Sequence, residues 1–280
     1  YVQGNVDVAD ASISGTEYVM CSINIEGYQM RPLCWGTTYA KPATISFWHK
    51  HSIAGKYSII LRSTDANYNY LIDYTQNTAD VWQKSTFVIK PPTSGSWDKS
   101  TGLGLRLGFT MTNGTTYQSS TIENWFSGQY YHSTPNQVQM MQTLNAKFRL
   151  TGIQLEVGEN ATDFEYLPYG EELALCQRYF WIVPNARWLM GYKRHDSYIY
   201  FQLDTPVPMR TSPTPTITSV GVLTNHQTTL GGAVQTTGTG VFEYRPDSGR
   251  GTLQISSTYS GTHTTIPSWE AGTIEFDAEL

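Results

Sequence analysis

Residues 148–180 read FRLTGIQLEVGENATDFEYLPYGEELALCQRYF, and they separate two β-rich halves of the chain. The first part of this stretch is rich in β-branched and aromatic residues, which is typical of a strand. Pro168 and Gly170 then interrupt the strand pattern. Glu171 and Glu172 follow, where negative charge suits the first turn of a helix. The stretch therefore predicts one short helix between two β segments.

The predicted helix has one apolar face. Leu173, Cys176 and Phe180 fall at positions i, i+3 and i+7 of that face, and Gln177 lies beside them. Pro184 ends the run, because proline cannot continue a helix. A helix this short is not stable by itself in water and has to pack against something. We therefore expect these four side chains to lie at an interface.

The sequence before the helix predicts many short strands. Gly, Pro, Asn and Asp punctuate them, and Asn113-Gly114 between two Thr-rich runs predicts a β-hairpin. Short strands at this spacing are typical of an antiparallel sandwich. The candidate strands cover residues 18–25, 44–49, 57–62, 68–74, 81–90, 104–112 and 146–155.

The sequence after Pro184 returns to a strand pattern. Residues 225–239 are rich in Thr, Gly and Gln and predict a polar hairpin or an exposed loop. The length of 280 residues suits about two domains. We therefore predict an all-β protein with a domain over 1–168, a linking helix over 169–183 and a small β-sandwich over 184–280. The candidate strands of the last domain cover 188–193, 197–203, 214–223, 240–244, 252–257 and 273–277.

Composition excludes several classes of protein. Charged residues make up 15% and aromatics 13%, which is too little charge and too much aromatic surface for a disordered chain. The net charge is −5 and no Lys/Arg cluster is present, so we expect no nucleic-acid partner. No apolar run approaches about 20 residues, so we expect no membrane insertion. The sequence begins at Tyr1 and has no signal-peptide pattern, as expected of a fragment or a trimmed product.

The sequence predicts no metal site and no required cofactor. His49 and His51 would point to the same face of a strand, but no third ligand type is nearby, so we interpret them as two exposed histidines. The three cysteines form no metal-binding pair and are interpreted as buried reduced thiols. A structural calcium is an open alternative, although no loop has a dense Asp pattern. Its candidate ligands are Asp7, Asp10, Glu26 and Asp163.

The sequence contains no nucleophile elbow, phosphate-binding loop or zinc-protease motif, so we predict a protein without enzymatic activity. Paired carboxylates that would support glycoside hydrolysis are nevertheless present, and a carbohydrate-active enzyme or its accessory module stays an alternative. We interpret these carboxylates as helix-start, strand and loop positions. They are Glu156, Glu159, Asp163, Glu165, Glu171 and Glu172.

Aromatic residues are the more promising candidates for binding. Residues 124–132 read NWFSGQYYH, and consecutive aromatic residues cannot all face one core. Aromatic rings stack on the C–H faces of sugars, although in a β-sandwich Trp and Tyr more often pack in the core or between subunits. The predicted glycan-binding candidates are Trp97, Trp125, Tyr130, Tyr131 and His132.

Several segments together resemble bacteriophage tail fibre and receptor-binding proteins. In the first half the similar segments are INIEG at 23–27, WGTTYAK at 35–41, ATISFW at 43–48 and SGSW at 94–97. Around the predicted helix they are GIQLEVG at 152–158, ATDFEY at 161–166 and ELALCQRYF at 172–180. In the second half they are PVPMRTSPT at 206–214 and FDAEL at 276–280.

This resemblance implies a jelly-roll module like those that bind carbohydrates over residues 1–168. It also implies a homotrimer whose axis passes by Leu173, Cys176, Gln177 and Phe180. Such a protein is made in the host cytoplasm and assembled into the virion, in a tail or capsid fibre. Its expected partners are other virion proteins and a host surface polysaccharide. A purely structural neck, collar or capsid fibre without receptor binding is the alternative within the same family.

Overall fold

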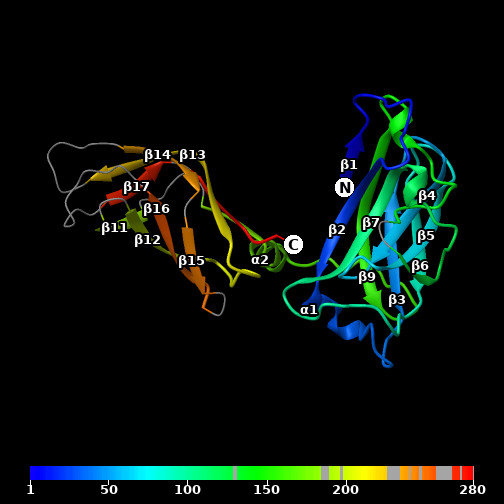
Figure 1. Ribbon diagram of the computed structural model, residues 1–280, viewed down its shortest axis with the longest axis horizontal. Helices are drawn as coiled ribbons and strands as arrows, with labels where there is room; N and C mark the ends of the chain where they lie inside the picture. The colour runs from blue at the N-terminus through cyan, green and yellow to red at the C-terminus, as the bar shows by residue number, and fades with distance from the viewer. Residues whose placement is uncertain are drawn as a thin grey trace. The chain divides into compact units, whose positions relative to one another are not determined.

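The computed structural model describes residues 1–128, 131–183, 189–195, 198–225, 234–239, 241–245, 248–256, 267–271 and 273–279. These residues form two compact units, Tyr1–Glu165 and Tyr166–Glu279 (Figure 1). Antiparallel strands dominate both units, and the described α-helices have four and nine residues. The prediction of an all-β sandwich protein is confirmed.

The N-terminal unit consists of two antiparallel sheets. The first has the order β1 (Val2–Asn5), β9 (Lys147–Val157), β3 (Ala43–His49) and β6 (Gln83–Ile89). The second has the order β2 (Tyr18–Glu26), β7 (Leu103–Asn113), β4 (Gly55–Arg62), β5 (Tyr68–Gln76) and β8 (Trp125–Ser127). The chain passes repeatedly from one sheet to the other, as in a jelly roll. Figure 1 shows β4, β5 and β7 side by side.

Short helices complete the N-terminal unit. They are α1 (Gly27–Met30) and the 3₁₀ turns η1 (Arg31–Leu33), η2 (Thr115–Tyr117) and η3 (Met140–Gln142).

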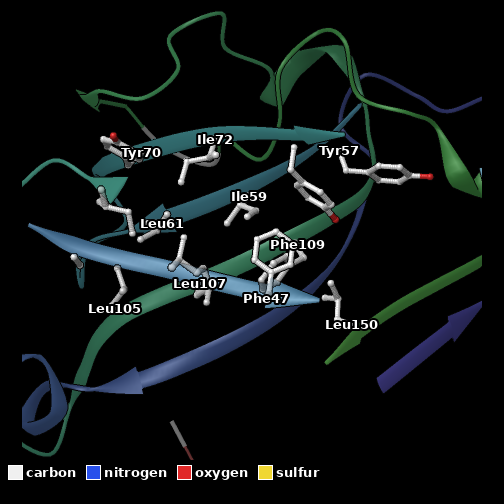
Figure 2. Packing of buried hydrophobic residues seen from close by; sticks show 14 of the residues in the cluster. Phe47, Tyr57, Ile59, Leu61, Tyr70, Ile72, Leu105, Leu107, Phe109 and Leu150 are labelled. Carbon is white, nitrogen blue, oxygen red and sulfur yellow. The ribbon is translucent and has the colours of Figure 1, made fainter. Parts of the chain in front are cut away.

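The core of this unit lies between the two sheets. Alternate residues of each strand point inward, so Phe47 of β3 packs edge-on against Phe109 of β7 and Tyr74 of β5, with ring centroids 5.1 Å apart in both pairs. Each such buried side chain contributes about 1.5–3 kcal/mol to stability. Figure 2 shows this packing, and the residues labelled in it are Phe47, Tyr57, Ile59, Leu61, Tyr70, Ile72, Leu105, Leu107, Phe109 and Leu150.

The hairpin predicted at Asn113-Gly114 is wrong. The chain after Gly114 enters the 3₁₀ turn η2, and the described partners of β7 are β2 and β4 rather than a strand that follows this turn directly. Gly114 has φ −71°, whereas the expected turn needs a positive φ. The Asn113 amide instead donates to the carbonyl of Tyr117 and the hydroxyl of Ser133, which directs the chain across the outer face of the sheet.

The C-terminal unit contains one long folded sheet. Its strand order is β10-β18-β13-β17-β11-β12-β16-β15, with β14 beside β13. Phe242 of β15 packs against Phe276 of β18 with centroids 4.7 Å apart, although these strands lie near opposite ends of that order. The sheet therefore folds over and encloses its own small core.

The bounds of these strands are β10 Phe180–Val183, β11 Leu189–His195, β12 Tyr198–Asp204, β13 Thr214–Asn225, β14 Val234–Thr239, β15 Val241–Arg245, β16 Arg250–Ser256, β17 Pro267–Ala271 and β18 Ile274–Asp277.

The linking helix is shorter than predicted. Helix α2 spans Tyr169–Gln177, with Glu171 and Glu172 in its first turn as expected. Residues 180–183 form β10, because Trp181 stacks on Phe276 at 5.1 Å and the strand pairs with β18. The segment predicted as the end of the helix thus belongs to the C-terminal sheet.

Candidate functional site

Trp125 packs inside the N-terminal unit and has no free face for a sugar. Its side chain is 9% exposed and contacts Tyr68, Trp35 and Trp97, with ring centroids 5.2–5.5 Å away. Its Nε1 donates to the carbonyl of Lys90 at 2.6 Å. The prediction of Trp125 as a stacking residue is wrong, because β8 joins the sheet and turns this side chain into the sandwich.

Trp97 belongs to the same aromatic cluster but is only half-buried. Its Nε1 donates to the carbonyl of Ser94 at 3.0 Å, which fixes the indole over Gly36 and Gly95. A Cβ at Gly36 would lie 2.5 Å from the Trp97 ring. The main contribution of Trp97 is therefore to close the end of the core.

Tyr131 remains at the surface. It is half-buried, and its ring lies 5.3 Å from that of Phe126 in an edge-on arrangement. Gly128, with φ +135°, lets the chain pass close to the Tyr131 ring. The remaining candidate of this cluster, Tyr130, lies outside the described residues.

His132 is 1% exposed, so its own ring cannot contact a ligand without rearrangement of its neighbours. It nevertheless supports the partly exposed ring of Tyr18, which can contact a ligand. The ring of Tyr18, at the start of β2, stacks on the imidazole with centroids 4.1 Å apart and planes 21° apart. Tyr117 packs edge-on against both rings, at 5.9 Å from Tyr18 and 5.5 Å from His132. We call Tyr18, Tyr117 and His132 the Tyr18 cluster.

The hydrogen bonds of His132 define its tautomer. Nη2 of Arg62 lies 3.1 Å from Nδ1, and arginine only donates, so Nδ1 accepts and Nε2 carries the proton. Burial, together with the smaller effect of the positive charges of Arg62 and Arg106, lowers the pKa of His132 to about 3. The imidazole is therefore neutral at pH 7, and its Nε2–H has no acceptor among the described residues.

Residues 114–128 and 131–138 lie against the outer face of the five-stranded sheet, and hydrogen bonds hold His132 there. The hydroxyl of Thr110 donates to the carbonyl of His132, and Arg62 donates to the carbonyl of Tyr131 at 2.8 Å. Further along, Thr134 donates to both carboxylate oxygens of Asp73, at 2.9 and 3.0 Å. These bonds cover an outer face that would otherwise be exposed to solvent, and they fix the support beneath Tyr18.

A pocket of about 340 Å³ borders Tyr18 at the edge of β2. Ile13, Val19 and Met141 supply apolar walls, and the carboxylates of Asp10 and Glu17 lie in the lining. Tyr18 is 48% exposed, so part of it is accessible to a ligand beside the pocket. One oxygen of each carboxylate already accepts a backbone N–H, that of Ser12 for Asp10 and that of Ser14 for Glu17. Sequence reasoning missed Tyr18, because its support comes from residues far along the chain.

Arg106 adds a cation to the same outer face. It is half-buried, faces Asn24 across the β2–β7 pairing, and its Nε donates to Oδ1 of Asn24 at 3.1 Å. Arg62 is its register partner on β4. Asn24 is six residues from Tyr18 along β2, about 20 Å, so this amide and guanidinium lie beyond the pocket.

The interpretation of His49 and His51 as exposed residues is wrong. Both are 0% exposed, because alternate residues of this segment point into the sandwich. Nδ1 of His49 donates to Oε1 of Gln76 at 2.8 Å, and its Nε2 accepts from Ser85. His51 stacks on Phe148 with centroids 4.1 Å apart. Every ring nitrogen of the pair has a partner.

The second ring of the pair is held in one tautomer. Nδ1 of His51 accepts from the backbone N–H of Arg149, so Nε2 donates to the hydroxyl of Tyr74 at 2.9 Å. Burial lowers the pKa of His51 to about 2, with smaller contributions from His49 and Arg149, and burial also lowers the pKa of His49. Both imidazoles are therefore neutral structural groups.

The described residues contain no group of three or more metal-ligating side chains. Of the calcium candidates, Glu26 is buried, whereas Asp7, Asp10 and Asp163 are exposed. Asp10 already accepts the backbone N–H of Ser12 at 3.0 Å. These carboxylates do not converge on a common site.

Glu156 is the best defined of the carboxylates considered for hydrolysis. It accepts two hydrogen bonds from Thr162 and one from Gln154. Burial raises its pKa, but these hydrogen bonds outweigh burial and leave the pKa below the ordinary value. A general acid of a glycosidase needs a raised pKa instead.

The four predicted interface residues lie on or beside α2. Leu173 is 38% exposed, Phe180 is 37% exposed, Cys176 is exposed and Gln177 is half-buried. The expectation of a buried thiol at Cys176 is therefore wrong for the single chain. A groove of about 490 Å³ runs beside the same helix and is lined by Leu167, Ala174, Leu175, Arg178, Val207 and Pro208.

Comparisons with known proteins identify no family. No protein-family model matches this chain, and no curated protein matches it. Of the described helices, none has the length and apolar character that a bilayer span requires.

Proposed function

We propose that this chain is a non-enzymatic attachment protein that binds glycans through the Tyr18 cluster and the pocket beside it. The observation that carries this proposal is a half-exposed tyrosine ring fixed at 4.1 Å on a buried histidine, next to a pocket of about 340 Å³. A ring that is already fixed loses little conformational freedom on binding. The sugar would stack on Tyr18, while Asp10 and Glu17 accept hydrogen bonds from its hydroxyls.

Such a site is shallow, and a single copy would bind weakly. Three copies on one assembly would gain affinity through effective concentration. The exposed apolar side chains of Leu173, Leu175 and Phe180 support a homotrimer, because these side chains would be buried between chains. The association would also give α2, which has no buried residue in the single chain, the packing that a nine-residue helix needs.

The sequence resemblance supports a place in a phage virion, in a tail or capsid fibre. In that setting the ligand is a host surface polysaccharide, and other virion proteins anchor the fibre. The lowered pKa of Glu156 disfavours the alternative of a glycosidase at that carboxylate. A fibre with a purely structural role in the virion would not need the exposed ring of Tyr18.

A glycan array with the full chain tests the proposal. We expect binding to a subset of bacterial surface glycans, and a loss of at least tenfold for Tyr18→Ala. Tyr39→Ala is the matched control, because Tyr39 is 81% exposed in the same unit and lies outside the Tyr18 cluster. Release of new reducing ends from a bound polysaccharide would establish an enzyme instead. Absence of binding across host glycans would favour the purely structural fibre.

A further inference from the structure

The C-terminal unit has a polar face on the outside of β12, β16 and β15. The inward residues Phe201, Leu253 and Phe242 are buried in the core, so the residues between them point outward. The pairing of these strands with each other and with β11 arranges the outward residues in three rows. The rows are Tyr192–Tyr200–Gln254, Gln202–Thr252–Glu243 and Asp204–Arg250–Arg245.

The first row provides an aromatic surface. The rings of Tyr192 and Tyr200 are stacked, with centroids 5.5 Å apart and planes 18° apart. Tyr192 is 49% exposed and Tyr200 is half-buried. The stacked rings restrict each other's rotation, so this pair, which we call the tyrosine platform, is held in place.

The other two rows lie in a groove of about 740 Å³. Gln202, Glu243 and Arg245 are exposed, and their side chains form no hydrogen bond with any described residue. Asp204 and Arg250 form a loose ion pair at 3.6 Å, with side chains 74% and 76% exposed. The groove thus presents amide, carboxylate, hydroxyl and guanidinium groups whose hydrogen-bonding capacity is available to a ligand.

We infer that this groove and the tyrosine platform form a second binding site, for a neutral oligosaccharide. The chemistry of the nine outward residues in the three rows favours this ligand. Two carboxylates and two guanidinium groups balance, so the face has no net charge that would attract an acidic or basic ligand. A nucleic acid needs an excess of positive charge. A protein interface is depleted of charged residues at its centre, whereas four of these nine residues are charged.

The size of the face matches several sugar units rather than one. Successive outward residues along a strand are about 7 Å apart, so the three rows span about 14 Å. A chain of pyranose rings would stack its first ring on Tyr192 and Tyr200. The hydroxyls of the following rings would meet Gln202, Thr252 and Glu243. The site lies in a different unit from the Tyr18 cluster and does not depend on it.

The test uses the full chain carrying Tyr18→Ala, so that binding at the N-terminal unit is removed. On an array of neutral and acidic oligosaccharides, this variant should retain binding to neutral ones. Adding Tyr192→Ala or Glu243→Gln should reduce that remaining signal at least tenfold. Glu243→Gln keeps the size of an exposed side chain, so it separates loss of binding from loss of folding. Tyr169→Ala, a change at a 78% exposed tyrosine of the same unit, should leave the signal unchanged.

Two results would overturn the second site. In the first, the Tyr18→Ala chain binds no neutral oligosaccharide although the unsubstituted chain binds glycans, so that the Tyr18 cluster alone accounts for binding. In the second, the Tyr18→Ala chain binds neutral oligosaccharides, but neither Tyr192→Ala nor Glu243→Gln reduces this binding. The proposal is supported if the Tyr18→Ala chain still binds neutral glycans and loses this binding with the added changes. That result would establish the C-terminal site independently of Tyr18.

Discussion

The ring of Tyr18 lies 4.1 Å above the imidazole of His132, with 21° between their planes. The first residue begins an edge strand, and the second belongs to a segment that lies against the outer face of the same sheet. Arg62 orients the imidazole by donating to its Nδ1. A buried, neutral and hydrogen-bonded ring thus supports the exposed one.

Two substitutions of His132 separate the stacking of its ring on Tyr18 from the hydrogen bonding of its nitrogen atoms. His132→Phe keeps an aromatic ring under Tyr18 but removes the Nδ1 acceptor of the buried Arg62, so stability at pH 7 should fall by about 1–3 kcal/mol. His132→Ala loses the same acceptor and also leaves a cavity, which should cost about 2–4 kcal/mol more. Glycan affinity should survive in the first variant and fall in the second. Equal effects of both variants in urea unfolding and in binding would contradict the stacking role.

The N-terminal unit should lose stability in mild acid. His49, His51 and His132 are neutral when folded, with lowered pKa values of about 2 for His51 and about 3 for His132. Unfolded histidine has a pKa of about 6.5, so below that pH only the unfolded chain binds these protons. Stability is therefore complete above pH 6.5 and is lost as the pH falls. His51 and His132 together give a limiting slope of about 2.7 kcal/mol per pH unit below about pH 5.5, and His49 adds to the slope in the same direction.

Carboxylates also reduce the free energy of unfolding as the pH falls, but at lower pH values than the histidines. Hydrogen bonding lowers the pKa of Asp65, Asp98 and Glu156, so their contribution is lost only below about pH 4. Unfolding free energies between pH 7.5 and 5 therefore report the histidines. His51→Phe should lower the slope by about 1.4 kcal/mol per pH unit. A flat profile over this range would show that these histidines are not buried as described.

Gly36 should be intolerant of any side chain. It has φ +80°, and an added Cβ would lie 2.5 Å from the Trp97 ring. Gly36→Ala should therefore cost about 2–4 kcal/mol, from backbone strain together with overpacking. Gly152→Ala is the control, because its φ is +57° but its nearest neighbour is 3.3 Å away, so it should cost about 1–2 kcal/mol. Equal losses in thermal unfolding would mean that Trp97 does not occupy this position.

The chain should associate through α2. Leu173→Glu places a charge on an exposed apolar position and should convert the trimer to monomers at micromolar concentration, because burying an unpaired charge costs several kcal/mol. Leu144→Glu, at a 55% exposed leucine in the N-terminal unit, should leave the trimer intact. Sedimentation equilibrium measures both. A monomeric unsubstituted chain would remove the multivalent part of the proposal.

Local pattern was enough to predict most of the strands. The predicted segments 57–62 and 68–74 correspond to Gly55–Arg62 and Tyr68–Gln76, because β-branched and aromatic runs bounded by turn residues mark strands without reference to the rest of the chain. The start of α2 was also predictable, from Pro168 and the two glutamates that follow it.

The candidate site was less predictable, because burial depends on contacts between distant segments. Trp125 and His132 look like surface aromatics in a polar stretch, yet the sandwich and the covering segment bury both. Asn113-Gly114 has a local hairpin signal, which is overridden by bonds of the Asn113 amide to Tyr117 and to the distant Ser133. Tyr18 has no local signal at all, and its role follows only from the histidine beneath it.

The most direct measurement is the affinity of the full chain for the strongest glycan on the array, determined by titration calorimetry. The unsubstituted chain and Tyr39→Ala should bind with the same dissociation constant. Tyr18→Ala should bind at least tenfold more weakly and stay folded, with about 0.5–1.5 kcal/mol of stacking energy lost. An affinity that is the same in all three proteins would show that the exposed ring on His132 takes no part in attachment.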